Sequence, residues 1–482
     1  MFDLRPVAYL IGILVAVLGL SMTLPMFVDL YFGNDHWLAM LEASVVVTSA
    51  GALVALASAN SAGGRLTIRQ TFLVTTAVWV MLPVFGAVPF VLGATEARVV
   101  DAFFEAMSGL TTTGSTVFTG LERLPQGLLL WRSMLQWFGG IGIIIVAMVF
   151  LPELKVGGMQ IFRSEAFDTD GKVLPRAAQI ASRIGAAYVA LTFGCFLSYL
   201  ATGMGTFDAA NHALTTLSTG GFSTYDASFG QFQGPAEYVA SVFMILASLP
   251  FVRYVQLLAG SVMPLRRDSQ VRVFIVLILG LVALMTVYRI LANGDHFEHA
   301  LREATFNITS IITGTGYASV DYQLWGTFPV VLFFFVGLIG GCAGSTCCSV
   351  KIFRYQILFA SISAQIRKIH SPHGMFSPRY DGRTVGEDVL SSVMAFFVLF
   401  FVTMGVMAVL LAATGLDTVT ALSGAATAMA NIGPGLGDTI GPAGNFATIN
   451  DTAKWLLTFC MLLGRLEIMS VFVILTPMFW RE

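Results

Sequence analysis

The chain has 482 residues, of which 56% are hydrophobic and only 11% are charged, and its mean hydropathy is +0.79. A soluble domain carries about 25% charged residues, so this composition excludes an ordinary soluble protein and requires lipid as part of the solvent. The net charge of −2 gives no indication of a nucleic-acid partner, and five cysteines in apolar or glycine-rich stretches do not suggest a disulfide framework.

Ten apolar runs are each near the roughly 20 residues that a helix needs to cross a bilayer. The first is too long for a signal-peptide core of about 7–15 residues, so we interpret it as a retained helix. The ten predicted spans are Val7–Leu30, Trp37–Ser58, Thr71–Leu92, Gly127–Leu151, Ile180–Thr202, Glu237–Val262, Val271–Ala292, Trp325–Phe359, Val389–Thr414 and Thr452–Pro477.

Four segments between these spans are more polar and too short to cross, since a helix of about 12 residues is only about 18 Å long. We expect them to form re-entrant half-helices. They are Val99–Thr111, Phe207–Thr216, Glu298–Ile312 and Asp417–Ala430.

Lys and Arg gather in alternate loops, which the positive-inside rule places in the cytoplasm. With ten spans, both termini are then cytoplasmic, and the segments that follow the half-helices lie on the outer side. The basic residues are Arg65, Arg69, Lys155, Arg163, Lys172, Arg176, Arg183, Arg253, Arg266, Arg267, Arg272, Lys351, Arg354, Arg367, Lys368, Arg379 and Arg383.

A short Thr/Gly-type signature follows each half-helix. Glycine permits backbone conformations that are costly for other residues, and four such loops around one axis can present backbone carbonyls to a cation. One Thr/Gly turn is ordinary loop chemistry, but four at equivalent positions predict a shared ion site. The signatures are Thr112-Thr113-Gly114, Ser218-Thr219-Gly220, Gly314-Thr315-Gly316 and Asn431-Ile432-Gly433.

An acid stands near the start of each half-helix, where it suits the positive end of the helix dipole. The negative ends then point toward the signatures and favour a cation. The acids are Asp101, Asp208, Glu298 and Asp417.

These features predict an all-α polytopic membrane protein with four pseudo-fourfold membrane–pore–membrane repeats after an N-terminal helix pair. The pair covers residues 1–70. The four units cover residues 71–152, 180–262, 271–360 and 389–482, with cytoplasmic linkers at 153–179 and 361–388.

The last span of the third unit is rich in glycine, with Gly337, Gly340, Gly341 and Gly344 in eight residues. Each glycine destabilises a helix by about 1 kcal/mol relative to alanine. We therefore predict a break, with Gly340–Ser349 forming a loop beneath the signatures. Close packing of an intact helix through GxxxG is the alternative. Cys342, Cys347 and Cys348 are a weak metal candidate because no His accompanies them.

Arg465 lies midway along the final predicted span. A central Arg costs at least about 2.5–3.5 kcal/mol on insertion scales, so it should face a cavity or a partner. The alternative is a structural pair with Glu467 or another buried acid, although residues two apart on a helix do not face each other.

The stretches Ser108–Thr116, Thr215–Thr224, Ile312–Ser319 and Ala430–Gly437 resemble the Trk/Ktr/HKT superfamily of potassium transport proteins, and within it the bacterial Trk pore subunits TrkH and TrkG. The resemblance covers essentially the whole chain. It implies potassium uptake through the bacterial inner membrane, as a channel or a symporter, with K⁺ as substrate and as the only metal, held at the twelve signature residues.

The resemblance also implies a gate, for which Gly340, Gly341, Gly344, Ser345, Thr346 and Arg465 are the candidates. It further implies a homodimer and a cytoplasmic TrkA-like regulatory subunit that binds nucleotides, with no cofactor on this chain. A Ktr-like sodium-dependent or sodium-permeable transporter remains an alternative. An intramembrane enzyme is a more distant one, because the sequence shows no clustered His, Asp or Cys at one membrane depth.

Overall fold

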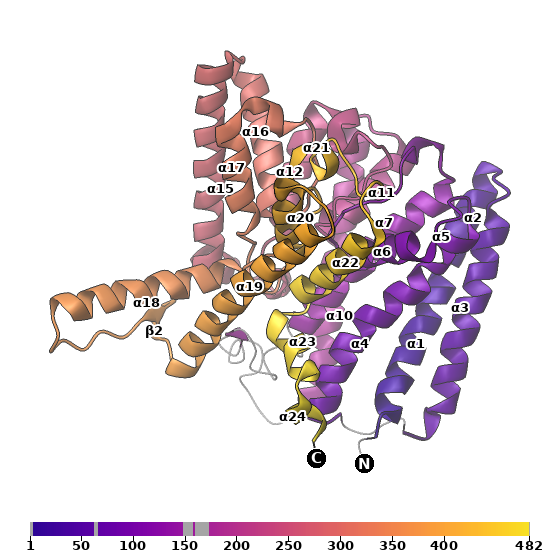
Figure 1. Cartoon of the computed structure of the whole chain (residues 1–482), viewed down its shortest axis with the longest axis horizontal. Coiled ribbons are helices and arrows are strands. Elements are labelled where there is room, and N and C mark those ends of the chain that lie inside the picture. The colour runs from indigo at the N-terminus through magenta and orange to yellow at the C-terminus, as the bar shows by residue number, and fades with distance from the viewer. Residues whose placement is uncertain (1–2, 62–65, 148–157, 160–172, 482) are drawn as a thin grey trace.

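The computed structural model describes residues 3–61, 66–147, 158–159 and 173–481, and these residues are almost entirely helical (Figure 1). Most of the predicted linker at 153–179 lies outside the described residues, as do Lys155, Arg163 and Lys172. Both ends of the chain lie at the same end of the molecule, as an even number of crossings requires.

The N-terminal part is a helical hairpin. Its first apolar stretch is divided at Met22 into two helices, and the next helix runs back antiparallel to them (Figure 1). Its helices are α1 (Arg5–Ser21), α2 (Thr23–Phe32) and α3 (Trp37–Ala57), followed by a 3₁₀ turn at Ala59–Ser61.

The first two units each contain a short helix between longer ones. The first comprises α4 (Ile68–Gly86), α5 (Val88–Leu92), α6 (Val99–Leu110), η2 (Leu121–Arg123) and α7 (Gln126–Ile145). The second comprises α10 (Val173–Ala201), α11 (Thr206–Leu217), η5 (Ser228–Phe232), α12 (Pro235–Ala247), α13 (Phe251–Leu258) and α14 (Met263–Arg267).

The third and fourth units repeat this order. The third comprises α15 (Ser269–Tyr288), η6 (Arg289–Asn293), α16 (Phe297–Ile312), η7 (Tyr322–Trp325), α17 (Thr327–Gly337) and α18 (Ile352–His370). The fourth comprises α19 (Glu387–Ala413), α20 (Thr418–Ala430), α21 (Gly437–Ile440), α22 (Asp451–Arg465), α23 (Ile468–Leu475) and α24 (Pro477–Trp480).

The predicted half-helices are α6, α11, α16 and α20. Asp101, Asp208 and Glu298 lie in the first turns of three of them, and Asp417 caps the fourth by accepting the N–H groups of Val419 and Thr420, both at 3.0 Å. The acids therefore stand where the helix dipole stabilises them, as the sequence predicts.

Seven segments among the described residues are long and apolar enough to cross a membrane, so the chain is an all-α multi-pass membrane protein. They are Arg5–Phe32, Trp37–Ala57, Ile68–Leu92, Gln126–Ile145, Ala181–Ala201, Ser269–Asn293 and Glu387–Ala413.

The other three predicted spans are interrupted. The break in the third unit is predicted from its glycines, whereas the bends in the second and fourth units are not, so the prediction of continuous helices is wrong for those two spans. Helices α12 and α13 meet at 90°, α22 and α23 meet at 112°, and residues 338–351 between α17 and α18 are not helical. Pro250, at the first bend, lacks the N–H that a continuing helix needs. At the second bend, Glu467 has a left-handed backbone with φ of 60°.

The predicted linker at 361–388 begins within a helix. Its first ten residues continue α18 as far as His370. A short antiparallel hairpin follows, with β1 (Arg379–Tyr380) paired to β2 (Arg383–Thr384). Regular helix is thus lost only beyond His370, in the part of the linker that contains both of its prolines.

Helices α1 and α3 touch through glycine. A Cβ atom placed on Gly51 would lie 2.3 Å from the backbone nitrogen of Ala16 and 2.7 Å from the carbonyl oxygen of Gly12. The hairpin in turn contacts the first unit through Asp29, whose buried carboxylate accepts the N–H of Gly127 at 2.6 Å.

We predict that Gly51→Leu separates α1 from α3 and costs about 1–3 kcal/mol or more, because the neighbouring backbone cannot move aside. The thermal unfolding temperature of the purified protein measures this loss. Gly405→Leu is the matched control, since a Cβ atom on this exposed glycine of α19 has no neighbour within 4 Å. Equal unfolding temperatures for the two variants would contradict the packing argument.

Candidate ion-binding site

All four half-helices end in the same backbone motif. In α6, α11 and α16 the second residue after the helix has a positive φ, and in α20 it is the first residue after the helix. The N–H group of this residue donates to the carbonyl three residues earlier in the chain. The next N–H bonds to a carbonyl five residues back. This is the Schellman arrangement. The first bonds are Thr112–Gly109 (2.9 Å), Thr219–Thr216 (3.0 Å), Gly314–Ile311 (3.0 Å) and Asn431–Ala428 (3.4 Å), and the second are Thr113–Ser108, Gly220–Thr215 and Thr315–Ser310 (each 2.9 Å) and Ile432–Thr427 (3.1 Å).

The left-handed residues of these motifs are strained at two places. Thr112 and Thr219 have φ of 54° and 50°. A β-branched residue at positive φ is a true outlier, and such strain persists only where the surrounding structure imposes it. The surrounding structure therefore imposes the backbone conformation at the ends of these two half-helices.

The four loops form a closed ring through contacts between glycine and carbonyl. A Cβ atom placed on the glycine that ends each loop would collide with the carbonyl oxygen of the middle residue of a neighbouring loop. The distances are 2.2 Å from Gly114 to Gly220, 1.9 Å from Gly221 to Thr315, 1.7 Å from Gly316 to Ile432 and 2.8 Å from Gly433 to Thr113. We call residues 112–114, 219–221, 314–316 and 431–433 the ring loops.

The ring corrects the predicted register of the second signature. Its equivalent residues are Thr219-Gly220-Gly221, one position later than Ser218-Thr219-Gly220. Ser218 still has a right-handed helical backbone and caps α11, whereas Gly221 has φ of 76° and takes the place of Gly114.

Two polar residues on α7, missed in the sequence, support the second ring loop from behind. Gln136 donates to the carbonyl of Gly220 at 2.6 Å and accepts the N–H of Phe222 at 3.0 Å. One turn earlier, Arg132 pairs with Glu105 at 2.8 Å and donates to the carbonyl of Ser223 at 3.0 Å. The reasoning that singled out Arg465, that a charge within an apolar helix needs a partner, applies equally to Arg132.

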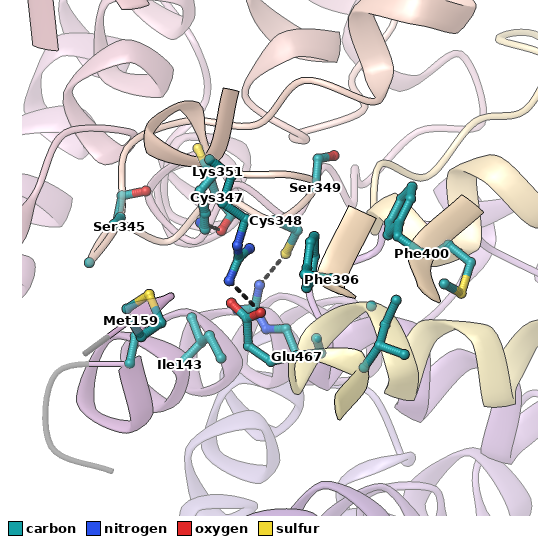
Figure 2. A pocket seen from close by; sticks show the side chains of 18 residues that line it. Ile143, Met159, Ser345, Cys347, Cys348, Ser349, Lys351, Phe396, Phe400 and Glu467 are labelled. Carbon is teal, nitrogen blue, oxygen red and sulfur yellow. Dashed lines mark hydrogen bonds and ion pairs between the residues drawn. The ribbon is translucent and has the colours of Figure 1, made fainter. Parts of the chain in front are cut away.

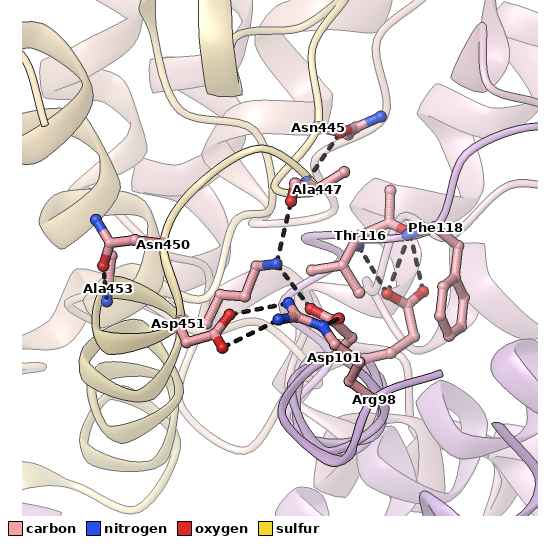
Figure 3. Close-up of polar contacts among 12 residues, drawn as sticks. Arg98, Asp101, Thr116, Phe118, Asn445, Ala447, Asn450, Asp451 and Ala453 are labelled. Atoms are coloured by element: carbon pink, nitrogen blue, oxygen red, sulfur yellow. Dashed lines mark hydrogen bonds and ion pairs between the residues drawn. The ribbon is translucent and has the colours of Figure 1, made fainter. Parts of the chain in front are cut away.

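Charged side chains join the first and fourth units near the start of α6 (Figure 3). Arg98 forms two bonds to Asp451, at 2.9 and 3.1 Å, and a third to Asp101 at 2.8 Å. The buried Lys454 donates to Asp101 at 2.7 Å. Burial raises the pKa of Asp101, but the hydrogen bonds and charges of Lys454 and Arg98 outweigh it, so that this pKa lies below its ordinary value. Asp101 therefore stays ionised and holds α22 against α6.

Side chains of the ring loops also join these two units. Asn431 donates to the hydroxyl of Thr113 at 2.9 Å, and Ser115 donates to the carbonyl of Gly433 at 2.8 Å. The ring is therefore held between its first and fourth members by hydrogen bonds as well as by backbone packing.

The predicted break in the third unit is confirmed, and the alternative of an intact GxxxG-packed helix is wrong. The non-helical segment lies against the ends of two half-helices: Ser349 N–H bonds to the carbonyl of Ala430 at 3.1 Å, and Cys348 Sγ lies 3.8 Å from the Thr112 hydroxyl. Thr346 donates to the carbonyl of Ala247, at the bend of the second unit, at 3.0 Å. The loop therefore lies directly beneath the ring.

The gate candidates occupy two places in this loop. Gly340 and Gly341 lie where the two ends of the loop meet, and the N–H of Gly340 donates to the carbonyl of Val350 at 2.9 Å. Gly344, Ser345 and Thr346 lie farther along, toward the other units. Gly344 has φ of 73°, and its carbonyl accepts the N–H of Phe251 at 2.9 Å.

Arg465 connects three units beneath the ring. It lies at the end of α22, is only 3% exposed, and donates to the carbonyl of Thr346 at 3.2 Å and to that of Gly139 on α7 at 3.0 Å. It also contacts Cys348 Sγ. The alternative pair with Glu467 is wrong, because the carboxylate of Glu467 pairs with Arg354 instead.

Within the part of the chain that the structure describes, no group of three or more His, Cys, Asp or Glu side chains is placed to hold a metal ion. The described backbone instead brings four carbonyl groups, those of Thr113, Gly220, Thr315 and Ile432, against the glycines of neighbouring ring loops at the C-terminal ends of the four half-helices.

Comparison with known proteins agrees with this architecture. The sequence model of the family described as "TrkH: Cation transport protein" matches residues 39–481. The chain is 43% identical to the Trk system potassium uptake protein TrkI of Halomonas elongata, over 99% of this chain and 97% of the relative. It is 36% identical to the Trk system potassium uptake protein TrkH of Salmonella typhimurium, over 99% of each.

A solved structure matches equally well. The crystal structure of the potassium transporter TrkH from Vibrio parahaemolyticus superposes with a TM-score of 0.92 at 32% identity, over the full length of both chains. The chain therefore belongs to the TrkH family, which is a family of cation transport proteins and not of enzymes.

Proposed function

We propose that this protein is the pore-forming subunit of a potassium uptake system and that K⁺ loses its water at the ring loops. The observation that carries the proposal is the closed ring, in which the glycine ending each loop packs against the carbonyl of the next. Carbonyl oxygens replace the hydration shell of the ion, and glycine leaves the mouth free of side chains. The proteins similar to this chain are named for potassium uptake, which favours K⁺ as the substrate.

The ion-binding residues under this proposal follow the corrected register. They are Thr112, Thr113, Gly114, Thr219, Gly220, Gly221, Gly314, Thr315, Gly316, Asn431, Ile432 and Gly433. In each ring loop a single glycine packs against a neighbouring backbone carbonyl so closely that a side chain is excluded. Because this constraint on the filter is limited, a Ktr-like sodium-permeable transporter remains the second candidate. Flux measurements in which K⁺ is replaced by Na⁺ separate the two.

The loop at Gly340–Ser349 acts as the gate in this proposal, and Arg465 holds it in the closed position. Support comes from the position of the loop beneath the ring and from the bond between Arg465 and the carbonyl of Thr346. Opening requires the loop to leave the ends of the first and fourth half-helices, which breaks few hydrogen bonds and no helix.

The proposal includes the bacterial inner membrane, with both termini cytoplasmic, a homodimer, and a cytoplasmic TrkA-like nucleotide-binding regulatory subunit. The alternating distribution of Lys and Arg supports this orientation. The relatives' names describe a Trk system, which supports a partner of some kind. The nucleotide would act through that partner.

The corrected register predicts that Gly221→Ala abolishes rescue of a potassium-uptake-deficient strain, whereas Gly220→Ala impairs it less. A Cβ atom on Gly221 meets a fixed carbonyl at 1.9 Å and needs positive φ, while one on Gly220 meets only the side chain of Gln136. The regulatory partner is supplied in the same strain. The reverse order of severity would restore the register predicted from the sequence, and failure of the unaltered protein to rescue would count against transport.

Gly316→Ser should reduce the preference for K⁺ over Na⁺, because its side chain enters the ring next to the carbonyl of Ile432. The measurement is ⁸⁶Rb⁺ uptake into proteoliposomes in competition with Na⁺. Unchanged discrimination would remove Gly316 from the proposed filter.

Deleting several residues within Gly340–Ser349 should raise flux, because the loop then no longer reaches the underside of the ring. Uptake of ⁸⁶Rb⁺ without the regulatory partner reports the change. Flux equal to that of the intact chain would exclude the loop as the gate.

A further inference from the structure

A cavity of about 40 Å³ lies beside Arg465, between the loop beneath the ring and the bend that joins α22 to α23 (Figure 2). A water molecule needs about 10–15 Å³ measured in this way, so the space accepts a single small ion or a few waters. The space is too small for a nucleotide or a peptide side chain from a partner.

The ionisable groups that line the cavity are mostly basic. They are Lys351, Arg354, Arg465 and Glu467. Arg354 is neutralised by Glu467, with which it forms an ion pair. Among the described residues, neither Lys351 nor Arg465 has a carboxylate within salt-bridge distance, so three basic side chains and a single carboxylate face the cavity there.

The partners of these two cations are neutral. Lys351 donates to the carbonyl of Cys347, and Arg465 donates to the carbonyls of Thr346 and Gly139. The Nε of Arg465 is buried and has no hydrogen-bond partner within the described part of the chain. A buried charged group with an unmade hydrogen bond carries a large desolvation penalty, which a counter-charge would relieve.

We propose that this cavity binds one small monovalent anion, of the size of chloride, between Arg465 and Lys351. The anion neutralises positive charge directly beneath the ring. Under the proposed function, on which this consequence rests, it lowers the electrostatic barrier that Arg465 and Lys351 raise against a cation leaving the ring. Chloride then acts as an activating ligand of cation transport.

The competing explanation is that the sulfur of Cys348, which contacts Arg465, already completes the surroundings of the guanidinium and leaves no need for an anion. The two explanations predict different responses to the composition of the solution. An anion site responds to the replacement of chloride and keeps that response in Cys348→Ser, whereas a guanidinium satisfied by Cys348 does not respond to the anion.

Binding is tested on the purified full-length chain by thermal unfolding in potassium chloride, bromide and gluconate at equal ionic strength. We expect a saturable rise in Tm with chloride and bromide, but not with gluconate, because a ligand that binds only the folded state stabilises it. The rise should vanish in Lys351→Gln and Arg465→Gln and persist in Cys348→Ser.

Lys368→Gln and Arg367→Gln are the matched controls, since each removes the same charge from an exposed position near the end of α18. Both should keep the response to chloride. A bromide peak beside Arg465 in the anomalous diffraction of soaked crystals would place the ion. No Tm response together with no bromide peak would overturn the proposal.

Transport is tested separately by ⁸⁶Rb⁺ uptake into proteoliposomes. Replacing chloride by gluconate on both sides should lower uptake on the order of tenfold, because one unit charge near the pathway is no longer neutralised. A Tm response without any Rb⁺ uptake would retain the anion site and reject the proposed function. Equal Rb⁺ uptake in chloride and in gluconate would reject the activating role of chloride.

Discussion

The packing of the glycine that ends each ring loop against the carbonyl of the next loop is the constraint on which the rest of the structure depends. Three of the four contacts leave less than 2.5 Å for a Cβ atom, so no side chain fits and the four units must stand at fixed distances. Half-helices, supporting side chains and inter-unit ion pairs all serve to hold that spacing. The strained Thr112 and Thr219 show that backbone energy is spent to maintain it.

Below the ring, the molecule places irregular backbone and buried charge where a membrane protein ordinarily excludes both. Three spans are interrupted at the level of Arg465 and its contacts: at the bend of the second unit, in the loop of the third and after α22. Such backbone is tolerated at membrane depth only where protein surrounds it or where it lines a cavity. One carbonyl freed by these breaks, that of Thr346, accepts a hydrogen bond from Arg465, so the break in the third unit and the buried charge stabilise each other.

The sequence predicted much of this arrangement because the signals were local. A helix of twelve residues with an acid in its first turn, a run of four glycines and an arginine in an apolar span each constrain their own neighbourhood. The half-helices and the broken third unit are confirmed on that basis. The second signature was placed one residue too early because Ser218-Thr219-Gly220 and Thr219-Gly220-Gly221 both read as small polar residues followed by glycine. The contact that distinguishes them is between Gly221 and the carbonyl of Thr315, ninety-four residues away.

Hydropathy, charge distribution and glycine content were thus enough to predict the half-helices, the broken third unit and most of the spans. Folding settled which glycine closes the second loop, that Arg132 and Gln136 support that loop, that Glu467 pairs with Arg354, and that Arg465 reaches Gly139 and Thr346. The physical reason is the range of the interactions. Burial and helix dipoles act on residues within one segment, whereas the partners of the Gly220 carbonyl and the Arg465 guanidinium lie on segments that are 84 to 326 residues away along the chain.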